Sequence, residues 1–187
     1  VTAPISKIAW HKAGHKFAGQ TELLGHLTNK KTSMLFTAIS PNNGWRFNTL
    51  LATTHIPLEK INNNLTKELI RYKLDALLGF CRKFKEKPFI QIAGLNPHAG
   101  EEGKIGIEEL NLIIPILNEW KSDNPGIKIN GPMPPDTCWI SSAEAWNSES
   151  TENNAPDGIL ALYHDQGLIP VKLIAFDEAV NTTLGLP

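Results

Sequence analysis

Residues 89–101 read Phe-Ile-Gln-Ile-Ala-Gly-Leu-Asn-Pro-His-Ala-Gly-Glu, an apolar strand-like run followed by a turn that carries a histidine. Residues 158–167, Gly-Ile-Leu-Ala-Leu-Tyr-His-Asp-Gln-Gly, repeat this arrangement, and His55 follows a third such run. Ligands of α/β proteins bind at the carboxyl ends of strands, so we expect His55, His98 and His164 to lie there. Three imidazoles in this context predict a divalent metal site with an open coordination position.

Strand-like and helix-like segments alternate on either side of these turns. Apolar residues three and four apart predict a long helix that ends before Pro88. Alternation with short loops is typical of an α/β fold with a largely parallel sheet, in which the Ser33–Thr53 hairpin is an antiparallel element. Residues 141–156 are polar and predict a surface insertion. The expected strands are Ser33–Ile39, Trp45–Thr53, Phe89–Gly94, Gly158–Leu162 and Ala179–Leu184; the expected helices are Ala3–Trp10, Thr21–Leu27, Leu65–Phe84, Ile107–Trp120 (kinked by Pro115) and one within Gly167–Phe176.

Composition narrows the class of protein. The 187 residues are 41% hydrophobic and carry a net charge of −1, so neither nucleic acid nor a membrane surface is an expected partner. Cys81 and Cys138 lack Cys-x-x-Cys spacing and are expected to be reduced thiols of a cytoplasmic protein. The chain does not begin with Met and stops directly after a strand-like run, so we expect a piece of a longer protein.

Each candidate site residue also has a simpler interpretation. A lone histidine in a turn is more often structural than a ligand, and the metal hypothesis depends on three histidines sharing one context. The glycine-rich segment 100–106 does not fit a phosphate loop, because His98 and Ile105 occupy positions where that motif needs Gly and Ser or Thr. Lys172 and Asn181 suit a phosphate or carboxylate substrate near the metal, but on sequence alone a solvated lysine and a turn or strand asparagine are the favoured interpretation.

Seven segments together resemble the 4-hydroxythreonine-4-phosphate dehydrogenase family (PdxA family) of vitamin B6 biosynthesis. They occur in the family's order and extend over the whole chain. The matching stretches are 1–7 (Val-Thr-Ala-Pro-Ile-Ser-Lys), 19–22 (Gly-Gln-Thr-Glu), 52–58 (Ala-Thr-Thr-His-Ile-Pro-Leu), 94–101 (Gly-Leu-Asn-Pro-His-Ala-Gly-Glu), 130–137 (Asn-Gly-Pro-Met-Pro-Pro-Asp-Thr), 163–167 (Tyr-His-Asp-Gln-Gly) and 180–187 (Val-Asn-Thr-Thr-Leu-Gly-Leu-Pro).

The resemblance implies a two-domain α/β subunit like those of the isocitrate and isopropylmalate dehydrogenases, of which residues 1–187 would be the central metal-binding and dimerisation part. It also implies a homodimer whose active site lies between subunits. The metal, zinc, magnesium or cobalt, would be bound by His55 and His98 of one chain and His164 of the other. The substrate-binding positions implied by the family are Gln20, Thr21, Lys172 and Asn181.

The implied reaction is the NAD-dependent oxidation of 4-phosphooxy-L-threonine, followed by decarboxylation to 3-amino-2-oxopropyl phosphate. The isolated chain is expected to be inactive, because the segments that complete the cofactor site are missing. Gln20 stands where the family usually has histidine, which leaves open a related substrate such as threonate or erythronate 4-phosphate. Two further alternatives are a zinc hydrolase that uses Glu101 or Glu102 as base, and a non-catalytic metal-binding dimer module.

Overall fold

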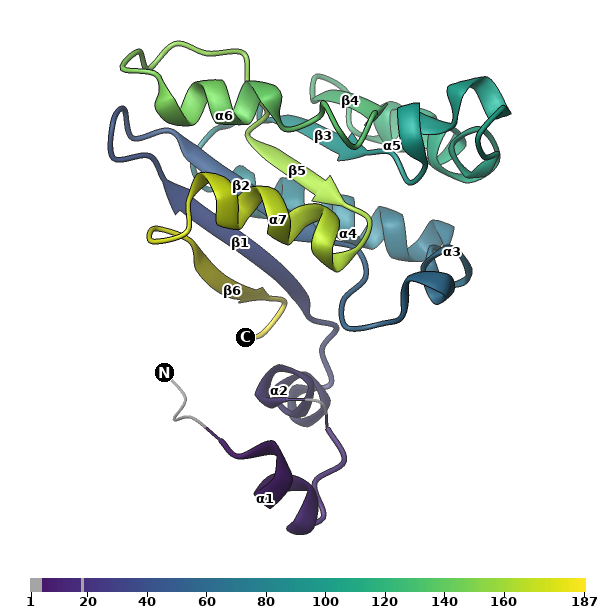
Figure 1. Ribbon diagram of the computed structural model, residues 1–187, viewed down its shortest axis with the longest axis vertical. Coiled ribbons are helices and arrows are strands. Elements are labelled where there is room, and N and C mark those ends of the chain that lie inside the picture. The colour runs from purple at the N-terminus through teal and green to yellow at the C-terminus, as the bar shows by residue number, and fades with distance from the viewer. Residues whose placement is uncertain (1–4, 18) are drawn as a thin grey trace.

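The structure, a computed structural model, describes residues 5–17 and 19–187. Within these ranges the centre is a six-stranded sheet in the order β4-β3-β5-β2-β1-β6 (Figure 1). The pairs β2–β5, β5–β3 and β3–β4 are parallel, whereas β1 is antiparallel to both β2 and β6. This confirms the predicted α/β class, with a largely parallel sheet and an antiparallel hairpin. The strands are β1 Ser33–Ile39, β2 Arg46–Leu51, β3 Phe89–Ala93, β4 Lys128–Met133, β5 Gly158–Ala161 and β6 Val180–Leu184.

Helices cover both faces of the sheet, with α7 in front of it and α4 behind it in Figure 1. Successive residues of a strand point to opposite faces, so Leu50 packs in the α4 core while Leu51 packs beneath α7. Thr66 caps α4 by accepting a hydrogen bond from the backbone N–H of Leu69, which starts this helix later than predicted. The helices are α1 Lys7–Lys12, α2 Gln20–Thr28, α3 Ile61–Asn64, α4 Lys67–Cys81, α5 Ile114–Asp123, α6 Ile140–Asn147 and α7 His164–Ile174, with 3-10 segments at Leu58–Lys60 and Pro97–Gly103.

The prediction of a surface insertion over residues 141–156 was wrong for its first half. Helix α6 occupies Ile140–Asn147 and buries Ala145 and Trp146, and Trp146 packs in a core cluster with Phe47 and Ile159 of the sheet. Its carboxyl end is held by the hairpin turn, because the Asn43 side-chain amide donates to the carbonyls of Ala145 (2.8 Å) and Ser148 (2.9 Å). Those bonds come from a residue far away in the sequence, so local composition did not reveal the helix.

Where a kink at Pro115 was expected, the helix changes from a π-helical turn to an α-helix. A π-helical turn, Glu109–Ile113, precedes α5, and Pro115 lies in the first turn of that helix. The π-helical turn ends just before Pro115, and such a change in helical hydrogen bonding accommodates a residue that has no N–H to donate. The turn and α5 together cover most of the predicted helix.

Strand β4 was not predicted, because Gly131 and Pro132 within it are typical of a turn. It lies at the edge of the sheet, where it pairs with β3. Proline is compatible with an edge strand, since one side of such a strand needs no hydrogen-bonded partner.

Helices α1 and α2 form an arm that lies apart from the sheet (Figure 1). Part of the predicted Ala3–Trp10 helix lies outside the described residues, and the helix observed is α1. The hydroxyl oxygens of Thr21 on α2 and Thr183 on β6 lie 3.4 Å apart, which connects the arm to the edge of the sheet. In the described part of the chain, no helix has the length and apolar character needed to cross a bilayer.

Candidate metal centre

The three candidate histidines follow three strands that are neighbours in the sheet. His98 follows β3, His164 follows β5 and His55 follows β2, in the sheet order β3-β5-β2. These strands are parallel, so their carboxyl ends all lie at the same end of the sheet. The predicted placement of the histidines at strand ends is therefore confirmed.

Two of the histidines are neighbours within one chain. The ring centroids of His55 and His164 lie 5.3 Å apart, and both side chains line a pocket of about 290 Å³. Oδ1 of Asp165 accepts a hydrogen bond from Nδ1 of His164 at 2.7 Å, which orients the ring and leaves Nε2 for a ligand. Two imidazoles at this separation, one of them oriented by a carboxylate, fit part of a divalent metal site.

Gln166 fixes the turn that carries His164. Its side-chain oxygen accepts from the backbone N–H of Leu162 at 2.6 Å, and its amide nitrogen donates to the carbonyl of Gly94 at 2.7 Å. The buried side chain therefore ties the end of β5 to the end of β3. Helix α7 consequently begins at His164 itself, earlier than the predicted start at Gly167.

The turn that carries His98 is left-handed throughout. From His98 to Glu102 every φ is positive, between 44° and 80°. Four of these five residues are not glycine, and each costs about 1–2 kcal/mol in this conformation, roughly 4–8 kcal/mol in total. His55 also has a positive φ, 46°. Strained residues of this kind are concentrated at functional sites, so the strain independently favours a role for both histidines.

The third candidate, His98, is not grouped with the other two histidines in the described part of the chain. No cluster of three or more His, Cys, Asp or Glu side chains able to bind a metal occurs in residues 5–17 and 19–187. His98 lines a separate pocket of about 260 Å³, which shares Tyr163 with the pocket of His55 and His164. The resemblance implies that His55 and His98 come from one subunit and His164 from the other; within this chain the rings of His55 and His164 lie 5.3 Å apart, and how the three histidines divide between subunits stays a prediction.

An exposed apolar surface adjoins the histidine pocket. On α7 it includes Leu173 (81% exposed) and Ile169 (58%), and Ile140 extends it onto α6. A groove of about 390 Å³ between these helices is lined by the same residues and also by Tyr163 and Asp165, which line the histidine pocket. A protein that covered this surface would therefore also reach the edge of the histidine pocket.

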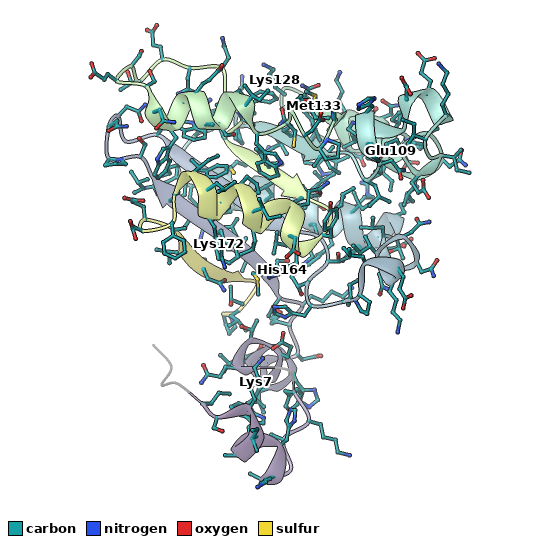
Figure 2. The ribbon with its side chains drawn as sticks, viewed as in Figure 1. Lys7, Glu109, Lys128, Met133, His164 and Lys172 are labelled. Carbon is teal, nitrogen blue, oxygen red and sulfur yellow. The ribbon has the colours of Figure 1, made fainter. Side chains whose placement is uncertain are left out.

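The four expected substrate-binding residues lie on three elements. Gln20 and Thr21 begin α2, and Thr21 contacts Thr183 on β6, the strand that also carries exposed Asn181. Lys172 is exposed near the end of α7, eight residues or about 12 Å of helix from His164 (Figure 2). The structure thus brings Thr21 close to the strand of Asn181, and it places Lys172 on the helix that begins with a candidate ligand.

Sequence reasoning missed Glu109. It lies in the first turn of the predicted helix Ile107–Trp120, yet its side chain is only 1% exposed and contacts the turn before His98. An acidic residue at a helix start is usually solvated, so no local signal distinguished this one from its neighbour Glu108.

Comparisons with known proteins agree on one family. A family model described as "Pyridoxal phosphate biosynthetic protein PdxA" matches residues 1–187. The 4-hydroxythreonine-4-phosphate dehydrogenases of Synechococcus sp. (strain RCC307) and Thermosynechococcus vestitus are 55% and 53% identical to this chain over its whole length. The chain covers 57% and 56% of these relatives. A crystal structure of 4-hydroxythreonine-4-phosphate dehydrogenase from Klebsiella pneumoniae matches with a TM-score of 0.80 and 35% identity, over 99% of this chain and 51% of that one. The chain therefore spans a little over half the length of the relatives it matches.

Proposed function

Since this chain belongs to the pyridoxal phosphate biosynthetic protein PdxA family, we propose that it is the metal-binding and dimerisation part of a 4-hydroxythreonine-4-phosphate dehydrogenase. The reaction is the oxidation of 4-phosphooxy-L-threonine by NAD, after which the β-keto acid loses CO2 to give 3-amino-2-oxopropyl phosphate. The subunit would have two domains, like those of the isocitrate and isopropylmalate dehydrogenases, and would act in the cytoplasm. The observation that carries the proposal is the pair of strand-end histidines, His55 and His164, beside an exposed apolar surface.

The side chains of the site divide between metal and substrate. His55, His98 and His164 would hold the ion between two subunits, and Asp165 keeps the ring of His164 in the required orientation. When bound, a divalent ion such as zinc, magnesium or cobalt supplies Lewis acidity that favours loss of the hydroxyl proton and stabilises the developing carbonyl.

The remaining residues bind the substrate away from the reacting carbon. Lys172 and Asn181 offer a cation and an amide to its phosphate, and Gln20 and Thr21 offer hydrogen bonds from the arm. Binding at a distance from the bond that breaks holds the alcohol in position for hydride transfer to NAD.

The second subunit would pack on the apolar surface of α6 and α7. Leu173 and Ile169 are exposed, and Tyr163 and Asp165 connect their groove to the histidine pocket. A homodimer formed there would bury these side chains and bring a second chain to the edge of the incomplete site.

Metal content and oligomeric state test the proposal together. We expect about one divalent ion per protomer of a dimer by elemental analysis, and loss of that ion in His55→Ala, His98→Ala and His164→Ala. His26→Ala, on the arm helix α2, is the matched control and should retain the metal. Leu173→Asp should give a monomer in sedimentation analysis and should lose metal as well. A chain that keeps its metal without His55 and His164 would refute the proposed centre.

A further inference from the structure

Glu109 is buried and forms no ion pair with any described residue. Figure 2 labels it on the π-helical turn before α5. A buried carboxylate needs compensating hydrogen bonds, so the donors that approach it indicate what it does. A π-helical turn is itself a feature that is frequent near functional sites.

Among the described residues, the hydrogen-bond donors to Glu109 come from the segment that leads to His98. Its Oε1 accepts from the backbone N–H groups of Leu95 (2.7 Å) and Asn96 (2.8 Å). Its Oε2 accepts from the side-chain amide of Asn96 at 2.9 Å. Asn96 is followed by Pro97 and His98, so these bonds fix the chain directly before the candidate ligand.

The segment after His98 closes on the same carboxylate. A Cβ atom on Gly100 would lie 2.7 Å from Oε2 of Glu109 and 2.8 Å from the carbonyl oxygen of Gly106. A Cβ atom on Gly106 would lie 2.3 Å from the amide nitrogen of Asn96. The left-handed turn is therefore folded tightly around Glu109, with contacts on both sides of His98.

We propose that Glu109 is a positioning residue that holds the left-handed His98 turn in the conformation needed for metal binding. This inference rests on the proposed function, since it takes His98 to be a metal ligand. Glu109 itself is not a ligand or a base, because both of its oxygens accept hydrogen bonds from the turn and the side chain is buried. Its effect on the ion is exerted through the position of the imidazole.

A set of charge-swap variants tests the proposal in the full-length protein. Glu109→Gln keeps the shape but turns one oxygen into a donor that faces the Asn96 amide, so the turn loses a hydrogen bond. Adding Asn96→Asp restores a donor–acceptor pair between positions 109 and 96. The swap is made in a Glu108→Gln background, because Glu108 also accepts from the Asn96 amide (2.8 Å) and would repel the new carboxylate. Glu108→Gln alone is the matched control.

Affinity for Co²⁺ and its visible absorption spectrum are measured for each variant, together with hydrogen exchange of the Leu95 and Asn96 amides. We expect Glu109→Gln to weaken Co²⁺ binding roughly 10- to 100-fold, to change the spectrum and to speed exchange of both amides. We expect Glu108→Gln to behave like the parent protein, and the swap to recover most of the lost affinity.

The outcomes separate this inference from the function on which it rests. If the parent protein binds Co²⁺ and Glu109→Gln binds it equally well, the positioning role is refuted while the metal centre stands. The role is also refuted if affinity falls and the swap does not restore it. If the parent protein binds no Co²⁺, the proposed metal centre fails, and the positioning role fails with it.

Discussion

Replacing Lys73 by methionine should stabilise this protein at neutral pH. Lys73 lies on α4, its side chain is only 6% exposed, and none of the ion pairs of the described residues includes it. Its ammonium donates to the hydroxyl of Ser33 (3.0 Å) and to the carbonyl of Thr32 (3.4 Å), both neutral groups. Burial therefore lowers the pKa of Lys73 from 10.5 to about 8.

The magnitude follows from that pKa. The difference between the ordinary value and the value in the folded protein corresponds to about 3 kcal/mol lost from the free energy of unfolding at pH 7. Methionine has a similar volume and no charge, but it leaves the buried Ser33 hydroxyl without this donor, which costs about 1 kcal/mol. We expect Lys73→Met to raise the free energy of unfolding by about 2 kcal/mol at pH 7.

The advantage of the variant should disappear in alkaline solution. Between about pH 8 and pH 10.5 the unfolded chain binds more protons at Lys73 than the folded chain, so the parent protein gains stability as pH rises. The difference between variant and parent should shrink by about 2 kcal/mol from pH 7 to about pH 9.5. Urea unfolding at both pH values, followed by tryptophan fluorescence, measures it.

Lys67→Met is the control, because Lys67 lies on the same helix but is exposed and pairs with Glu119 at 2.6 Å. Its effect should be small and nearly independent of pH in this range. If Lys73→Met is destabilising at pH 7, or if its effect does not change with pH, then Lys73 is not held in the folded protein with a lowered pKa, and the argument from burial is wrong.

Three further predictions concern the core and the strand ends. Burial raises the pKa of the Cys81 and Cys138 thiols to about 12, so the folded protein retains protons that the unfolded chain loses, and the contribution of these two thiols to stability should fall above about pH 9. In urea unfolding, a protein in which both are alanine should gain stability relative to the parent protein as the pH rises above about 9. Gln166→Leu leaves two buried backbone groups at the strand ends unpaired and should lower the free energy of unfolding by about 2–5 kcal/mol, and an unchanged urea midpoint would contradict the bridging role. Trp120→Ala should lower the free energy of unfolding by about 3–5 kcal/mol, because it removes a large buried side chain. Trp120→Phe loses mainly the 2.7 Å hydrogen bond to Asp75 and should cost about 1–2 kcal/mol. Equal losses in the two variants would show that packing contributes little at this position.

Elements that depend on local pattern were predictable. The spacing of apolar residues in α4 and the alternation of strands and turns around β1, β2, β3 and β5 are properties of short segments, and they led to the α/β class. Elements that depend on distant partners were not. Helix α6 is capped by Asn43 and strand β4 exists because β3 lies beside it, so their own polar or proline-containing sequences pointed elsewhere.

The sequence by itself determined the chemistry available at the carboxyl ends of the parallel strands: His55, His98 and His164 each lie in a short turn after an apolar strand. Only the tertiary structure decided which of them meet. His55 and His164 are neighbours because β2 pairs with β5, and His98 is set apart in a left-handed turn packed around Glu109. The order of the strands and the burial of the Glu109 carboxylate depend on hydrogen bonds and packing between segments far apart in the chain. The periodicity of apolar residues within one segment does not reveal those contacts.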